Sequence, residues 1–209
     1  MRVTGGTWAG RRLRAPRGGA VRPTSDRVRE SLFARLRDLS GARVLDLYAG
    51  TGALGIEALS RGAAAAVFVE RARPALACLE ANLESLAAGA RARVLRADVR
   101  AGLARLAREG ARFELVLVDP PYGAADAAQA LADVARLALL APAGTLVLET
   151  SRRHPPGRVP GLALADERRY GDTLVARYVP EGTSLGGPPA AEADRIAGAG
   201  TGNAGEDGA

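Results

Sequence analysis

The residues best suited to chemistry form one short stretch, Asp119-Pro120-Pro121-Tyr122, directly after the apolar run 113–118. An amino group on a nucleobase is a weak nucleophile, because its lone pair is delocalised into the ring. Asp119 and the carbonyl oxygen of Pro120 could accept hydrogen bonds from its two N–H groups, and Asp119 could take the departing proton. The prolines stiffen the loop, and Tyr122 offers a ring on which an extruded base can stack. The alternative interpretation is a Pro-Pro turn beside a core tyrosine.

A glycine-rich loop follows an earlier apolar run, residues 43–48. Gly50, Gly52 and Gly55 have the spacing G-x-G-x-x-G at the start of a predicted helix, which lets a ligand approach the backbone closely. Glu70 lies fifteen residues beyond Gly55, where it could bind ribose hydroxyls. Enzymes that use NAD and enzymes that use S-adenosylmethionine share this pattern, and so does a tight turn without a ligand.

Two further carboxylates favour a methyl donor without deciding the matter. Asp46 lies in the first apolar run, where NAD-binding sequences more often have an apolar residue. Asp98 follows the run 92–97, where a methyltransferase would meet the adenine amino group. The alternative interpretation of Asp98 is an N-cap of the next helix.

The elements that must position these residues alternate along the chain. Apolar runs predict strands at residues 43–48, 65–70, 92–97, 113–118 and 145–150. Segments rich in Ala, Leu and Glu predict helices at about 53–61, 74–87, 100–109 and 125–139. The alternation predicts an α/β fold, with a mostly parallel sheet covered on both faces. After Pro160, a turn at residues 171–172 predicts an antiparallel hairpin that completes the sheet.

The first 40 residues are the most basic part of the chain. They contain ten arginines and three acids, a net charge of +7, in a chain whose total is +6. Residues 2–16 predict a short hairpin or ordered arm, and residues 22–39 predict a capped amphipathic helix. The clustered arginines favour nucleic acid as a partner. A GC-rich genome would explain why all 29 basic residues are arginine, but not why they cluster.

Composition argues against several other classes of site. One cysteine, Cys78, excludes an internal disulfide, and one histidine, His154, argues against a zinc or iron site, so we expect no metal. We interpret Cys78 as a packing residue and His154 as part of a solvated loop. Without a membrane-length apolar stretch or a signal-peptide core, we expect a soluble cytoplasmic protein with no membrane partner. Residues 181–209 carry a net charge of −4 and predict a disordered tail.

These residues carry a family resemblance. Residues 46–61, Glu70, Asp98 and 119–122 resemble class I S-adenosylmethionine-dependent methyltransferases that act on amino nitrogens. The segments RVTGGTWAGRRL, RPTSDRVRESLF and RRYGDTLVARY are similar to the bacterial 16S rRNA guanine-N2 methyltransferases that modify guanine 966. The resemblance implies a Rossmann-like sheet, S-adenosylmethionine as cofactor, and an assembled or nearly assembled small ribosomal subunit as substrate. Nothing in it demands more than a monomer.

The resemblance also implies roles for single residues and a division of the chain. The cofactor would be held by Asp46, Tyr48, Gly50, Thr51, Gly52, Glu70 and Asp98, with Arg22, Pro23 and Thr24 closing over the site. The base would be presented by Asp119, Pro120, Pro121 and Tyr122. RNA would be bound by Arg2, Trp8, Arg11, Arg12, Arg14 and Arg27, although the family often has basic residues where Thr7 and Ala9 stand. The division is a basic arm and helix (1–40), a methyltransferase domain (41–180) and the tail (181–209).

Three other functions stay open. A DNA adenine-N6 methyltransferase would use the same tetrapeptide. A nicotinamide-dependent oxidoreductase would use the same glycine-rich loop. A non-catalytic assembly factor would bind rRNA through the arginine-rich arm alone.

Overall fold

The structure is a computed structural model that describes residues 1–16, 26–36, 38–121, 124–155 and 157–183 of the 209-residue chain. Arg22, Pro23, Thr24 and Tyr122, which we predict to be site residues, lie outside the described residues, as does the tail from residue 184 onward.

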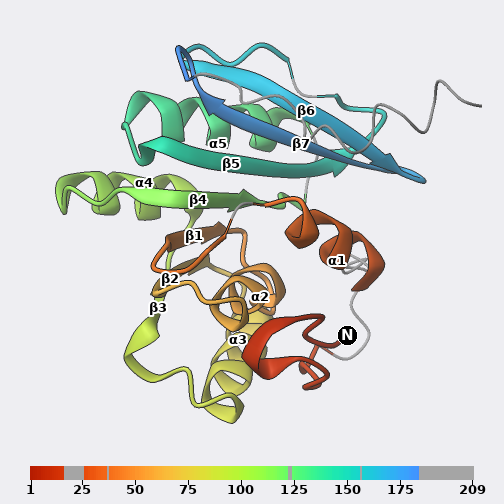
Figure 1. Cartoon of the computed structure of the whole chain (residues 1–209). Helices are drawn as coiled ribbons and strands as arrows, with labels where there is room; N and C mark the ends of the chain where they lie inside the picture. Colours follow the sequence, from red (N-terminus) through yellow and green to blue (C-terminus); the bar gives the residue numbers. More distant parts are fainter. Residues whose placement is uncertain (17–25, 37, 122–123, 156, 184–209) are drawn as a thin grey trace, which may run out of the picture.

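A seven-stranded sheet dominates the described residues, in the order β3-β2-β1-β4-β5-β7-β6 (Figure 1). The strands are Arg43–Leu47 (β1), Ala65–Glu70 (β2), Ala92–Arg96 (β3), Phe113–Val118 (β4), Leu140–Ser151 (β5), Leu162–Tyr170 (β6) and Thr173–Pro180 (β7). Neighbours among β1 to β5 pair in parallel, and β7 pairs antiparallel with both β5 and β6. The predicted Rossmann-like sheet with an antiparallel C-terminal hairpin is therefore confirmed.

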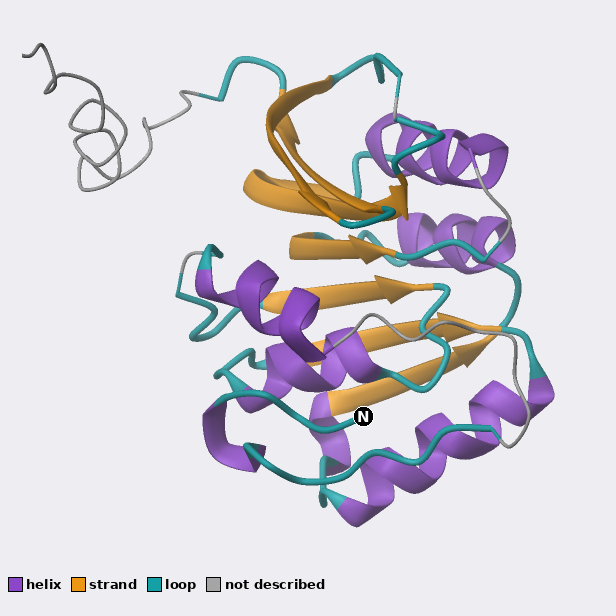
Figure 2. Ribbon diagram, turned by 90° about the vertical axis from the view of Figure 1, so that its right-hand side faces the viewer, coloured by secondary structure: helices purple, strands orange, loops and turns teal. Residues whose placement is uncertain are grey.

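Helices cover both faces of this sheet (Figure 2). The described α-helices are Asp26–Ala34 (α1), Ala53–Ser60 (α2), Arg73–Ser85 (α3), Val99–Arg108 (α4) and Ala124–Arg136 (α5). Short 3-10 helices lie at Gly6–Trp8 (η1) and Gly89–Arg91 (η2). One apolar cluster joins the N-terminal arm, α1, α2 and α3 to one face of the sheet, and a second joins α4 and α5 to the other. No helix of the described residues is long and apolar enough to span a membrane.

Within residues 43–151, two element boundaries differ from the sequence prediction by three residues or more. α5 ends at Arg136 rather than at residue 139, because Ala138 adopts φ 49° and turns the chain out of the helix. β5 begins at Leu140 rather than at residue 145, and its pairing with β4 shifts register between Phe113 and Leu115. Pro142 and Gly144 lie in this first part of β5, and both residue types are depleted in strands.

The N-terminal arm, residues 1–16, folds back on itself and packs against α2. An isolated antiparallel bridge joins Arg2 to Arg12, and the N–H of Val3 donates to the carbonyl of Arg11 at 3.0 Å. Gly6 has φ +77°, and a Cβ there would lie 1.8 Å from the carbonyl oxygen of Ser60. Only glycine allows this approach, so the Gly-Gly turn that the sequence displays brings the arm against the end of α2.

Candidate active site

The glycine-rich loop turns sharply between β1 and α2. Tyr48, Gly50 and Gly52 all have positive φ, of 56°, 56° and 80°. A Cβ at Gly52 would lie 2.3 Å from Cδ1 of Leu79, so the helix start requires glycine both for its backbone and for its packing. The loop therefore presents bare backbone at the N-terminus of α2, where N–H groups and the helix dipole favour a polar or anionic ligand.

Glu70, at the end of β2, lies directly against this loop. One of its carboxylate oxygens, Oε2, accepts the N–H of Gly50 at 2.8 Å. The other, Oε1, accepts the N–H groups of Arg71 and Ala72 at 2.8 and 2.7 Å. Since a carboxylate offers about four acceptor positions, these bonds hold Glu70 in place and leave about one position for a ligand hydroxyl.

Asp46, on β1, bonds to the backbone at the start of α2, directly after the glycine-rich loop. It is 1% exposed, and its Oδ2 accepts the N–H of Gly55 at 2.9 Å. Burial, with a smaller contribution from the nearby charge of Glu70, raises the pKa of Asp46 to about 7 despite the opposing effect of the Gly55 hydrogen bond. In this structure Asp46 acts on the loop through the first turn of α2, and its predicted contact with a cofactor stays a prediction.

Asp98 follows β3 at the same edge of the sheet. It is the N-cap of α4, where its Oδ1 accepts the N–H of Ala101 at 3.0 Å. Its side chain is exposed, so capping one end of a helix leaves the carboxylate accessible to a ligand. The structure thus shows the capping role, and the predicted contact with an adenine amino group stays a prediction.

The tetrapeptide lies beside the glycine-rich loop. β4 pairs in parallel with β1, with Val118 opposite Leu47, so Asp119 leaves the sheet next to Tyr48. Asp119 and Pro120 are half-buried, and Pro121 is exposed. The carboxyl ends of neighbouring strands meet at one edge, where open α/β sheets place their ligands, so the predicted donor site and the predicted base site adjoin.

Tyr48 connects the loop to the helix after the tetrapeptide. Its hydroxyl donates to the carbonyl of Asp126, on α5, at 3.5 Å. Burial raises the pKa of Tyr48, and the charge of Asp126 adds to this, so the hydroxyl stays protonated at neutral pH. Among the described residues, no group of three or more His, Cys, Asp and Glu side chains could hold a metal ion.

Comparisons with known proteins agree with this geometry. The family described as conserved hypothetical protein 95 matches residues 1–179. The chain belongs to this family. YlbH of Bacillus subtilis strain 168 is 37% identical over 184 residues, which cover 87% of this chain and 100% of YlbH.

A relative and a solved structure, both from Escherichia coli, extend the comparison. Ribosomal RNA small subunit methyltransferase D of strain K12 is 45% identical over 123 residues, which cover 58% of this chain and 60% of that protein. A solved structure of yhhF has a TM-score of 0.77 and 36% identity, and covers 87% of this chain and 98% of that chain. The predicted family and the predicted methyltransferase fold are therefore confirmed.

Asn82, which sequence reasoning missed, joins the N-terminal arm to the glycine-rich loop. It lies on α3 and is 1% exposed. Its Oδ1 accepts the N–H of Arg14 at 2.7 Å, and its Nδ2 donates to the carbonyl oxygens of Arg14 at 3.1 Å and Thr51 at 3.0 Å. The side-chain amide of Asn82 thus links the arm to Thr51, which is predicted to hold the cofactor.

Glu57 on α2, also missed, holds the first residues of the arm. It is fully buried, and it accepts the N–H and the hydroxyl of Thr4 at 2.8 and 2.7 Å. The guanidinium groups of Arg29 and Arg61 donate to the same carboxylate at 3.3 and 2.7 Å. Arg29 is itself fully buried and reaches Asp26 at 2.9 Å and the carbonyl of Arg2. A polar residue on the apolar face of a helix was the available signal for both Glu57 and Asn82.

The predicted RNA-binding residues separate into two groups. The exposed arginines of the arm and α1 are Arg2, Arg11, Arg12, Arg14 and Arg27. The Trp8 side chain is instead half-buried against the apolar cluster, and the backbone N–H of Trp8 donates to Oγ of Ser60 at 2.9 Å. The guanidinium of Arg91 covers its ring at 4.9 Å, so Trp8 in this structure holds the arm in place.

Proposed function

We propose that this protein transfers a methyl group from S-adenosylmethionine to the exocyclic N2 of a guanine in 16S rRNA of the small ribosomal subunit, a site of the guanine-966 type. The relative named ribosomal RNA small subunit methyltransferase D supports rRNA as the substrate class. The observation that carries the proposal is the β1–β4 register, with Val118 opposite Leu47, which brings Asp119 beside the glycine-rich loop.

The residues around that loop fit S-adenosylmethionine. Gly50 and Gly52, with φ of 56° and 80°, form the sharp turn that leads into the N-terminus of α2, where a ligand can meet the backbone. Glu70 presents its carboxylate beside them and suits the ribose hydroxyls, and the exposed carboxylate of Asp98 suits the adenine amino group. When bound, the cofactor supplies an electrophilic methyl group.

The tetrapeptide supplies what the guanine amino group lacks. The carboxylate of Asp119 and the carbonyl of Pro120 accept hydrogen bonds from the two N–H groups and orient the nitrogen lone pair toward the methyl carbon. Methyl transfer would break the S–C bond of the cofactor and release one amino proton, which Asp119 or water would accept. Pro120 and Pro121 restrict the backbone, which keeps the two acceptors in alignment.

The arm supplies the contacts to RNA phosphates. Its exposed arginines, with Arg27 of α1, form a basic surface next to the cofactor loop to which Asn82 ties it. Residues 1–40 then serve as the RNA-binding part and residues 41–180 as the catalytic part. Residues 22–24 lie between the arm and α1 along the chain, and we propose that they close over the cofactor.

The test is an assay with labelled S-adenosylmethionine and small subunits that lack the native modification. We expect N2-methylguanosine at one site, identified by mass spectrometry of the nucleosides. Asp119→Ala should lower the rate at least about 100-fold, the usual contribution of a positioned acid-base group, with the affinity for the cofactor unchanged. Glu84→Ala, an exposed acid on α3, is the matched control and should keep wild-type activity.

Each remaining function has its own test. Formation of N6-methyladenine in duplex DNA, without methylation of rRNA, would identify a DNA methyltransferase. Binding of NAD in place of S-adenosylmethionine would identify an oxidoreductase. Full complementation of a deletion strain by Asp119→Ala would show that the protein acts in assembly without catalysis.

A further inference from the structure

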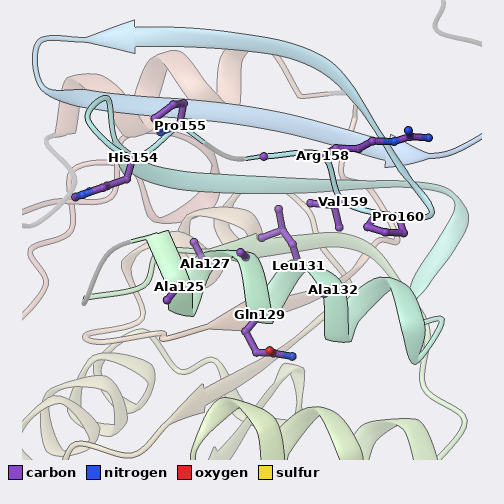
Figure 3. A pocket seen from close by; sticks show the side chains of 12 residues that line it. Ala125, Ala127, Gln129, Leu131, Ala132, His154, Pro155, Arg158, Val159 and Pro160 are labelled. Carbon is purple, nitrogen blue, oxygen red and sulfur yellow. The ribbon is translucent and has the colours of Figure 1, made fainter.

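The connection from β5 to β6 leaves a hollow on the α5 face of the sheet. β5 and β6 run in the same direction with β7 between them, so the chain must cross one face of the sheet. A helix usually makes such a crossing, but here residues 152–161, of which 156 lies outside the described residues, form a loop. A hollow of about 430 Å³ lies between this loop and α5 (Figure 3).

The hollow begins at the edge of the sheet that carries the tetrapeptide. α5 starts at Ala124, two residues after the tetrapeptide, and the crossing loop starts after Ser151, at the carboxyl end of β5. Figure 3 shows Ala125 and His154 at this end of the hollow and Pro160 at the other. An RNA strand that places one base at the tetrapeptide would therefore pass the near end of the hollow.

The side chains of the hollow suit a nucleotide. Ala125, Ala128 and Ala132 give α5 a flat, apolar side toward the hollow, and Pro155 and Val159 face it from the loop. Flat apolar surfaces accept the face of an unstacked base. The volume also falls within the range of small-ligand sites, about 300–1,000 Å³.

The rim of the hollow is basic. Arg158 lines the hollow toward its Pro160 end, and the exposed residues Arg152 and Arg153 directly precede His154 at the other end (Figure 3). Among the described residues, Arg152 pairs with Asp172 at 3.3 Å, whereas Arg153 and Arg158 take part in no ion pair. Charge complementarity therefore favours a phosphate-bearing partner over an apolar protein segment.

We propose that this hollow binds an rRNA nucleotide next to the target base, with Arg153 and Arg158 contacting its phosphates. This inference rests on the proposed function. A base extruded into the active site leaves its neighbours unstacked, and RNA-binding proteins recognise such bases by stacking. The arm lies with α2 and α3 on one face of the sheet and the loop lies on the other, so RNA is held from both sides of the catalytic edge.

The first test removes the charges. Arg153→Ala/Arg158→Ala should raise KM for small subunits about tenfold and lower the slope of log affinity against log salt by about one per arginine. The affinity for S-adenosylmethionine should not change. Arg108→Ala/Arg112→Ala, which removes two arginines that do not line the hollow, at the end of α4 and before β4, is the matched control and should behave as wild type.

The second test fills the hollow. Ala128 is exposed on α5, so Ala128→Trp should fold normally while it occupies the space of a base. We expect kcat/KM for small subunits to fall about tenfold, a loss comparable to one stacked base. Ala104→Trp, at an exposed position of α4, is the control.

Ultraviolet cross-linking to small subunits identifies the occupant. A nucleotide adjacent to the methylated guanine, attached to the tryptic peptide HPPGR (residues 154–158), would support the proposal. A cross-link from this peptide to a ribosomal protein would overturn it, and so would wild-type kinetics in both variants. Failure of the wild type to methylate rRNA would instead overturn the proposed function.

Discussion

The two faces of the sheet hold their covering segments in different ways. On the face of the arm, α1, α2 and α3, the polar side chains of Arg29, Glu57, Ser60 and Asn82 are buried and hydrogen-bonded among apolar residues. On the face of α4 and α5, the cluster is mainly leucine, valine and alanine, with Phe113 and Tyr178, and a loop beside α5 leaves a hollow. The buried Asp133 on this face bonds with Gln129 and Arg136 of its own helix and, among the described residues, ties no other segment to α5.

This difference arises because apolar contacts and hydrogen bonds differ in how strictly they fix the position of a segment. Apolar packing is not directional, so it stabilises helices without selecting one arrangement of a short, irregular arm. A buried hydrogen-bond network is satisfied in one arrangement only, because an unpaired buried group costs free energy. The network therefore fixes the arm beside the glycine-rich loop, while packing on the other face leaves the hollow beside α5.

The strongest test of the comparison removes one side chain from each face. Glu57→Ala leaves the buried Arg29 without its carboxylate partner there and should lower the free energy of unfolding by about 3–5 kcal/mol. Leu103→Ala, on the other face, should cost about 2–5 kcal/mol through a cavity. Urea unfolding measures both.

Brief trypsin digestion under native conditions then separates the two variants. We expect cleavage in the arm, after Arg11, Arg12 or Arg14, only in Glu57→Ala, because only that variant loses the bonds to Thr4. Equal cleavage of the arm in both variants would show that general destabilisation, and not the network, releases it.

The next effect concerns Asp46, the buried carboxylate next to the glycine-rich loop. Since the pKa of Asp46 is about 7 in the folded protein and near 3.8 in the unfolded chain, the folded state binds more protons between these values. The contribution of Asp46 to the free energy of unfolding is therefore largest below about pH 4 and is lost as the pH rises toward 7. Asp46→Asn has no carboxyl group to titrate, so its stability lacks this pH dependence.

The expected result is a difference in pH dependence. From pH 5 to pH 8, the free energy of unfolding of the wild type should fall relative to Asp46→Asn by on the order of 2–3 kcal/mol. Urea unfolding at pH 5, 6.5 and 8 measures this. A constant difference across the range would mean that Asp46 does not titrate there.

A smaller effect should follow from Asn82→Ala. This variant loses the bonds to Arg14 and Thr51, so we expect a cost of about 1–3 kcal/mol and weaker binding of S-adenosylmethionine by several-fold. Calorimetric titration with the cofactor is the measurement, and Ser85→Ala on the same helix is the control. Unchanged affinity with reduced stability would show that the arm does not order the cofactor loop.

Much of the fold could be predicted because its signals are local. The apolar runs place β1 to β4 to within one residue, since buried parallel strands need such runs. The start of β5 was missed because Pro142 and Gly144 interrupt the pattern. The end of α5 was missed because Ala138 turns the chain without the glycine that usually marks a helix end.

The sequence by itself determined the alternation of strands and helices, the glycine turn and the stiff acidic tetrapeptide, because each depends on residues a few positions apart. Only the tertiary structure decided the bonds of Glu57 to Arg29 and of Asn82 to Arg14, which join residues 28 and 68 positions apart. The tertiary structure also decided that the loop after β5 leaves a hollow between itself and α5. Such contacts depend on how whole elements pack, and no local pattern of residue types encodes that.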